Sequence, residues 1–177
     1  PLFLSVFASP RLEQVPLRLL LGGAGGWRLK LMALRRRLRL TDCVDMPGFL
    51  PHDRLREFMQ NHDMLVVPSV VHSNGDRDGI PNVIMEALSH RMPVVATDVC
   101  GISEVIRDGE TGLLVPQRDP RALALAVRRM LEDRERALGM AEAGRALVEQ
   151  MFDRDTNITA LRGLYLSADR SRRTEQG

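Results

Sequence analysis

PSVVHSNGDRDGIPNVIMEALSHRMPVVATDVCGISE, residues 68–104, is the stretch that decides the fold of this chain. An apolar run, Met64–Val67, precedes it and predicts a buried strand. A polar loop ending at Gly79 leads to a helix that opens at Pro81, and the apolar run Val94–Ala96 predicts the next strand. Strand, glycine loop, helix and strand form the pattern of a parallel sheet, in which ligands bind beyond the carboxyl ends of the strands.

The start of this helix predicts an anion site. Pro81 suits the first helical position, where its missing N–H costs nothing. Ile80 precedes it and has no side chain that can cap the helix. The amides of Asn82 and Val83 are therefore left open at the positive end of the helix dipole, which favours phosphate. Gly79 has no Cβ to obstruct the approach of a ligand.

Two acids flank the same helix start. Asp78 lies in the glycine loop and Glu86 lies one turn into the helix, on the same face as Asn82. The spacing leaves two interpretations open. Either both acids serve one pocket as its catalytic residues, or Asp78 is a solvated loop acid and Glu86 an exposed helical residue.

The pattern acid-Gly-x-Pro-Asn-x-x-x-Glu-Ala resembles the E-x7-E signature of the family 4 (group 1) retaining glycosyltransferases. Further matches follow in the same order, at Pro93–Thr97, Gly101–Glu104, Asp108–Val115 and from Arg145 to Phe152. The resemblance implies a single half of the two-domain GT-B fold, the C-terminal nucleotide-sugar-binding domain. It also implies that Glu86 holds the ribose hydroxyls and that Asp78, one methylene shorter than the usual Glu, contacts the donor sugar.

The resemblance extends the donor site to the ends of other strands. It implies that Gly48, Phe49 and Leu50 meet the nucleotide base, although Phe49 can equally belong to the core. The turn that begins at Gly22 and Gly23 follows a strand and lies near the donor in this family, although a purely structural turn also explains it. Gly101 allows close approach in a third loop, where Cys100 replaces a glycine that the family usually has.

The expected fold class is α/β, a Rossmann-like parallel sheet flanked by helices, with a helical C-terminus. Further strands are expected at 17–21, 43–50 and 113–115, and further helices at 27–40, from Pro51, from Asp119–Pro120, at 135–151 and after Asp153. We expect an irregular segment at 1–16, the donor-binding domain at 17–166 and a polar tail at 167–177.

The N-terminal segment departs from the family pattern. Leu2–Val6 predicts a short strand, but Ala8–Pro16 is shorter than the roughly dozen residues that a parallel crossover needs. Either this strand lies elsewhere or it does not form. The arginine and lysine that hold the donor diphosphate in the family have no clear counterpart here.

Composition excludes several other classes. A chain of 177 residues with 44% hydrophobic and 27% charged residues has the composition of one globular domain. Neither a membrane-spanning run nor a signal peptide is evident. Cys43 and Cys100 are isolated, which favours a reducing cytoplasm, and no residues show metal-ligand spacing, so neither a metal nor a cofactor is expected.

A basic cluster, Arg35–Arg37 with Arg39, stands out in a chain whose net charge is only +2. Its simplest interpretation is a solvated helix face. The alternative is attraction to anionic lipid headgroups, and hence peripheral contact with the inner membrane surface. A nucleic-acid role is less favoured, because no aromatic residues are interleaved with the arginines.

The sequence therefore predicts the donor-binding domain of a glycosyltransferase. Such a domain would transfer a sugar from a nucleoside-diphosphate sugar with retention, together with an acceptor domain that is not in this chain. A non-catalytic binding or regulatory subunit is the alternative, favoured by Asp78, Cys100 and the missing basic motif. Another GT-B-type enzyme, such as a nucleotide-sugar epimerase, fits the acid spacing less well.

Overall fold

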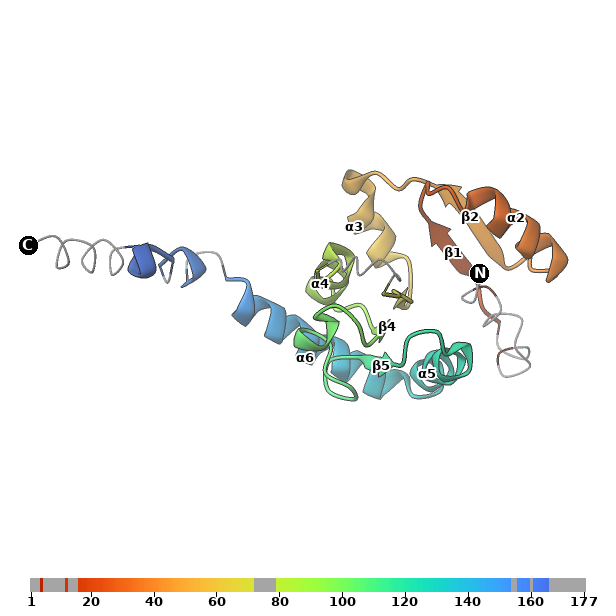
Figure 1. Cartoon of the computed structure of the whole chain (residues 1–177). Coiled ribbons are helices and arrows are strands. Elements are labelled where there is room, and N and C mark those ends of the chain that lie inside the picture. Colours follow the sequence, from red (N-terminus) through yellow and green to blue (C-terminus); the bar gives the residue numbers. More distant parts are fainter. Residues whose placement is uncertain are drawn as a thin grey trace, which may run out of the picture.

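The computed structural model describes residues 4, 12, 16–71, 79–153, 156–159 and 161–165. Strands and helices alternate along the chain, as expected for an α/β fold (Figure 1). In order they are β1 Leu19–Gly22, α2 Arg28–Arg37, β2 Val44–Gly48, α3 His52–Gln60, β3 Leu65–Val67, α4 Asn82–Ser89, β4 Val94–Thr97, the 3₁₀ helix η1 Ile102–Glu104, β5 Leu113–Val115, α5 Pro120–Glu132 and α6 Arg134–Met151.

All the strand pairs in these elements are parallel, which confirms the predicted fold class. The strands form two sheets and not one continuous sheet. β1 pairs with β2, while β3, β4 and β5 form a second sheet in that order. The two sheets are thus separate units of the same parallel architecture.

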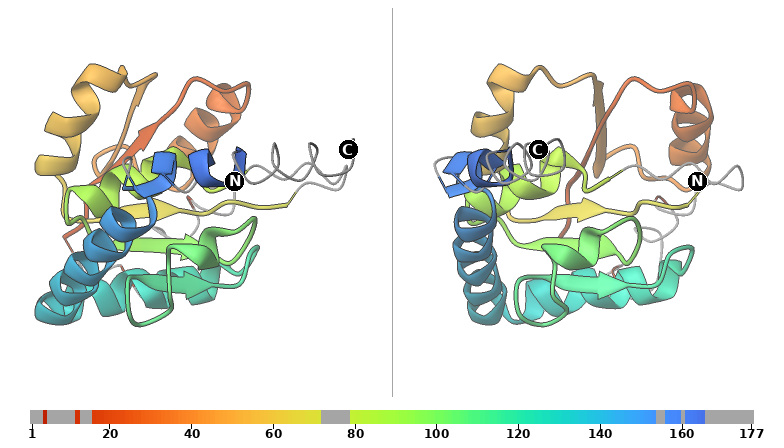
Figure 2. Two further views of the ribbon diagram at one scale, coloured as in Figure 1. Left: turned by 90° about the vertical axis from the view of Figure 1, so that its left-hand side faces the viewer. Right: turned by 60° about the vertical axis from the view of Figure 1, so that its left-hand side comes forward.

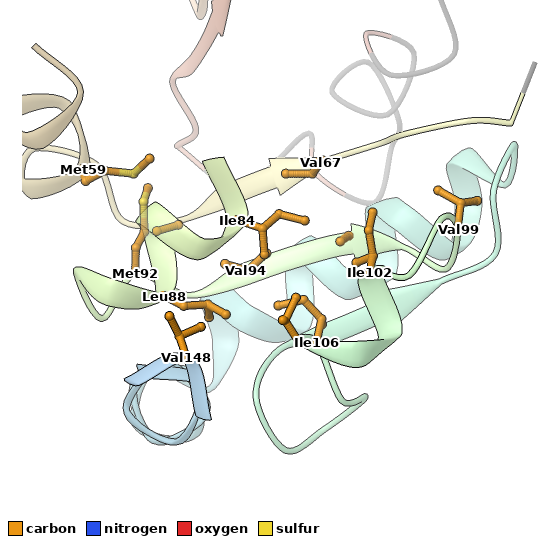
Figure 3. Packing of buried hydrophobic residues seen from close by; sticks show 13 residues of the cluster. Met59, Val67, Ile84, Leu88, Met92, Val94, Val99, Ile102, Ile106 and Val148 are labelled. Atoms are coloured by element: carbon orange, nitrogen blue, oxygen red, sulfur yellow. The ribbon is translucent and has the colours of Figure 1, made fainter. Parts of the chain in front are cut away.

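The larger sheet is buried on both faces, and β4 runs through its middle. Val94 and Ala96 point to one face, where they meet Ile84 and Leu88 of α4 (Figure 3). Val95 points to the other face and packs with α5. Side chains alternate between the faces of a strand, so a continuous apolar run is what a strand covered on both sides requires.

Helix α5 covers that second face (Figure 2). Asp119 caps it as the sequence predicts, since its carboxylate accepts the N–H groups of Arg121 and Ala122, both at 2.9 Å. The predicted inner residues Leu123, Val127 and Met130 are buried. Local capping and helical periodicity therefore positioned this helix correctly.

Helix α6 packs against α4 on the first face. The helices approach closely at Gly144, where a Cβ would lie 2.6 Å from Leu88 Cδ2 and 3.1 Å from the Thr111 carbonyl oxygen. Val148 of α6 joins the same core (Figure 3). This packing fixes α4, which carries the predicted site residues Asn82, Val83 and Glu86.

The two-stranded sheet has a small core of its own. Leu31 and Leu34 of α2 and its C-cap residue Leu38 pack on Leu40 and Val44, as the predicted apolar stripe requires. Leu4 joins this cluster and is fully buried.

Leu4, the described residue of 2–6, lies in a helix, which agrees with the alternative that no strand forms there. One detail of the prediction is wrong. Pro81 is the N-cap of α4 and not its first residue, since its ψ of 125° is extended. Asn82 and Val83 therefore become the first two helical residues.

After α6, residues 156–159 and 161–165 are helical. Asp153 caps this helix as predicted, accepting the N–H of Thr156 at 2.7 Å. The Thr156 hydroxyl, and then its backbone N–H, hold the pKa of Asp153 below its ordinary value. The helix projects away from both sheets, with Ile158, Leu161 and Tyr165 exposed (Figure 1).

Candidate functional site

The predicted site residues that the structure describes lie where the parallel strands end. At β1 and β2 these ends touch each other. The N–H of Gly23 donates to the Gly48 carbonyl oxygen at 2.7 Å, and Leu50 packs so closely on Gly22 that a Cβ there would lie 2.6 Å from Leu50 Cδ1. Gly48 has φ 96°, a conformation that favours glycine. Phe49 is 74% exposed, so the alternative that placed it in the core is wrong.

The helix that follows the glycine loop begins without a side-chain cap. No side chain hydrogen-bonds to the N-terminus of α4 within the described part of the chain. The Ile84 N–H bonds to the Pro81 carbonyl oxygen at 2.9 Å, while the N–H groups of Asn82 and Val83 precede that first bond. The expected open amides at a positive helix end are therefore present.

Glu86 lies one turn further along α4 and faces the start of α3. Its Oε1 is 3.6 Å from His52 Nδ1, and its side chain is 29% exposed. This contact connects α4 to the segment that follows Gly48, Phe49 and Leu50. The sequence predicted no partner for His52, because nothing local indicates that the start of α3 lies beside Glu86 of α4.

A third turn lies beside the start of α4. Gly101 has φ 76°, and a Cβ there would lie 3.7 Å from Ile80 Cγ1 and 3.0 Å from Glu104 Oε1. Glu104 therefore folds back over its own turn. Cys100 also has a positive φ, 53°, which is a costly conformation for a residue with a side chain.

Hydrogen bonds hold the loops at this edge together. Thr97, buried at the end of β4, donates its hydroxyl to the Ser69 carbonyl oxygen at 2.6 Å. The Val71 N–H donates to Gln117 Oε1 at 3.0 Å, which ties the segment after β3 to the turn after β5. Residues 72–78, among them the predicted site residue Asp78, lie outside the described residues.

Arg28 is a second residue that sequence reasoning missed. It opens α2, two residues after the last glycine of the turn, and its guanidinium donates to the Met46 carbonyl oxygen at 3.1 Å. Its Nη1 lies 3.3 Å from the position that a Cβ on Gly48 would occupy. A fixed positive charge therefore lies beside the loop predicted to meet the base. The sequence signal that could have identified Arg28 was a cation shortly after a glycine turn.

The described residues also form cavities away from the carboxyl ends of the strands. One cavity of about 370 Å³ is lined by Met64 and Pro93, which precede β3 and β4, and thus lies at the opposite edge of the sheet. It has neither glycine turns nor an open helix start, so we place the candidate site at the carboxyl edge. Among the described residues, no helix is long and apolar enough to cross a membrane.

Comparison with known proteins shows that the chain matches a family. Residues 1–147 match the family model described as "Glycosyl transferases group 1". The amylovoran biosynthesis glycosyltransferase AmsK of Erwinia amylovora is 34% identical over 114 residues, which is 64% of this chain and 28% of AmsK. The chain thus spans about a quarter of the length of the curated relatives it matches first.

Solved structures share the fold. Sucrose-phosphate synthase from Thermosynechococcus elongatus superposes with a TM-score of 0.79 at 28% identity, over 96% of this chain and 42% of that enzyme. Anabaena HepE, solved in complex with UDP-glucose, superposes with a TM-score of 0.78 at 23% identity, over 94% of this chain and 44% of HepE. In each case the similarity takes in most of this chain and less than half of the other protein.

Proposed function

The chain belongs to the group 1 glycosyl transferases, and we propose that it is the donor half of such an enzyme, binding a nucleoside-diphosphate sugar at the carboxyl edge of its strands. Transfer to an acceptor, with retained anomeric configuration, requires an acceptor domain beyond this chain. A cytoplasmic location and peripheral membrane contact belong to the same proposal.

Each part of the donor has a proposed partner. The Glu86 carboxylate accepts hydrogen bonds from the ribose hydroxyls. The amides of Asn82 and Val83 donate hydrogen bonds to the diphosphate at the helix start. Gly48, Phe49 and Leu50 contact the base. Asp78 contacts the sugar from the loop beside Gly79.

The proposal rests on one observation at helix α4. Its start is uncapped, and a carboxylate, that of Glu86, lies one turn further along the helix. The amides attract an anion. The carboxylate repels a phosphate but accepts hydrogen bonds from hydroxyl groups. A ligand with both a diphosphate and a diol satisfies both ends, and a nucleoside diphosphate has this composition. HepE, which shares the fold, binds UDP-glucose, so UDP is the first ligand to test.

The same amides would assist the chemistry. As the donor's glycosidic bond breaks, negative charge builds on the leaving diphosphate, and fixed N–H donors stabilise it without reorganising. The reacting groups must also be held together and shielded from water, which one half of a cleft cannot do. We therefore propose that the chain binds its donor but transfers the sugar poorly or not at all by itself. No metal is assigned a role.

The C-terminal helix fits a role in a two-domain enzyme. Its exposed apolar residues Ile158, Leu161 and Tyr165 have no core to cover within the described part of the chain. We propose that this helix packs on the acceptor half.

Calorimetric titration of the purified chain with UDP, GDP and ADP tests the donor proposal. We expect one diphosphate to bind, and Glu86→Ala to weaken it roughly 10- to 100-fold, since charge-assisted hydrogen bonds contribute about 1.5–3 kcal/mol. Glu57→Ala is the matched control, because Glu57 is an exposed glutamate on α3. It should bind as the unmodified chain does.

Two results would contradict the proposal. The first is no heat with any diphosphate from a chain whose circular dichroism shows it to be folded; the non-catalytic subunit would then be the better account. The second is equal affinity in the unmodified chain and in Glu86→Ala, which would move the site away from α4.

A further inference from the structure

Positive charge in this protein is concentrated on one helix. Residues 27–40, with the sequence WRLKLMALRRRLRL, contain six cations and no acid. The whole chain has a net charge of only +2, so the rest of the sequence is net negative. Helix α2 is therefore a basic surface on an otherwise slightly acidic protein.

The charge faces outward. Leu31, Leu34 and Leu38 turn into the small core, and the opposite face is exposed. That face consists of Leu29, Lys30, Ala33, Arg36 and Arg37, which we call the outer face of α2. In Figure 1, α2 lies on the far side of β1 and β2 from α3 and α4, so the outer face points away from the candidate donor site.

Among the described residues, the cations of the outer face have no acidic partner. Arg28 and Arg35 donate to the backbone oxygens of Met46 and Thr41 and so belong to the fold. By contrast, Arg36 and Arg37 form no ion pair with any carboxylate in the described part of the chain. Some arginines on other helices do, as in the pairs Arg128–Glu132 and Arg145–Glu149.

Apolar groups lie among these charges. Leu29, at the N-terminal end of the outer face, is 78% exposed, and Trp27, which precedes the helix, is 54% exposed. Lys30 Nζ lies 4.6 Å from the Trp27 ring centroid, so cation and ring are held together. Tryptophan and basic residues are the side chains enriched where proteins meet the interface of a bilayer.

We propose that the outer face of α2 docks the protein on an anionic lipid bilayer. Lys30, Arg36 and Arg37 would meet the headgroups, with Leu29 and Trp27 inserted between them. This names the surface for the membrane contact of the proposed function, but it does not depend on donor binding.

The charge distribution favours a bilayer over nucleic acid. A flat bilayer contacts only one face of the molecule. Its anionic headgroups are therefore attracted to the basic helix and do not meet the net-negative remainder of the protein. A nucleic-acid polyanion that follows the protein surface would meet both. An exposed leucine also has a clear role in a lipid interface, whereas single strands are bound by aromatic platforms.

The single tryptophan of the chain makes the test direct, because Trp27 alone reports insertion. The full chain is mixed with phosphatidylcholine vesicles, with or without about one-third phosphatidylglycerol. We expect flotation with the anionic vesicles only, weakening as salt rises, together with a blue shift of Trp27 emission and its quenching by brominated lipid. At about 1 kcal/mol per cation, Arg36→Gln with Arg37→Gln should weaken partitioning roughly 30-fold.

The control removes the same charge elsewhere. Arg121→Gln with Arg129→Gln alters two exposed arginines of α5 and should leave vesicle binding within about twofold of the unmodified chain. Equal losses in both double variants would show a net-charge effect and overturn the assignment to α2. So would flotation without any change in Trp27 emission, no flotation at all, or tighter binding to a single-stranded oligonucleotide than to the vesicles. Vesicle binding by a chain that binds no diphosphate would support this inference while contradicting donor binding.

Discussion

At the residue scale, the candidate site depends on Glu86 and on what surrounds its carboxylate. His52 Nδ1 lies 3.6 Å from Glu86 Oε1, but the His52 side chain is 86% exposed. Exposed pairs of this kind are worth about 0–1 kcal/mol, because water screens them. His52 is therefore a positioning residue for Glu86 and not an independent ligand in our proposal.

This role predicts that His52→Ala weakens UDP binding by about two- to fivefold, since a carboxylate without its neighbour samples more orientations. Because His52 acts through Glu86, the effect should vanish in the Glu86→Ala background. Calorimetry on the four proteins of this double-mutant cycle measures it. An undiminished loss in the Glu86→Ala background would mean that His52 contacts the ligand itself.

At the element scale, the packing of α6 on α4 fixes the position of α4. Gly144 allows this approach, and Gly139 of the same helix has open space around it. The two glycines share a helix and differ in their surroundings, so they separate helix propensity from packing. Propensity alone favours alanine at both positions.

We expect Gly144→Ala to lower the free energy of unfolding by about 1–3 kcal/mol, because the new Cβ overlaps Leu88 and approaches the Thr111 carbonyl oxygen. Gly139→Ala should raise it by about 0.5–1 kcal/mol. Urea unfolding followed by circular dichroism measures both changes. Stabilisation by both substitutions would show that α6 does not lie as close to α4 as the structure places it.

At the scale of the whole molecule, the division of the strands into two sheets is the main feature. The proposed donor contacts come from both sheets: Gly48–Leu50 follow β2, and Glu86 lies between β3 and β4. The two-stranded sheet has the smaller core. Units with fewer buried apolar contacts open at lower free energy.

Hydrogen exchange should therefore be faster in β1 and β2 than in β4 and β5. Saturating UDP, bound to both units, should slow exchange in the end of β2 as well as at the start of α4. Mass spectrometry of the exchanged chain resolves these segments. Protection confined to α4 would show that the β2 loop takes no part in binding, whereas uniform exchange in both sheets would show a single cooperative unit.

The sequence by itself determined the elements of this protein and the order in which they occur. The apolar run Val94–Ala96, the cap at Asp119 and the stripe Leu31, Leu34 and Leu38 all lie within a few residues of what they specify. Strand burial, helix capping and helical periodicity depend on neighbours in the chain, so a single sequence contains this information. For the same reason the open helix start at Asn82 was predicted to within one residue.

Only the tertiary structure decided which distant groups meet. The contact of His52 with Glu86 and the separation of β1 and β2 from the larger sheet join or separate residues far apart in the chain. Local patterns do not encode these relations, because they follow from how whole elements pack to bury apolar surface. The sequence thus specified a parallel α/β chain with an uncapped helix start, and packing decided what surrounds that start.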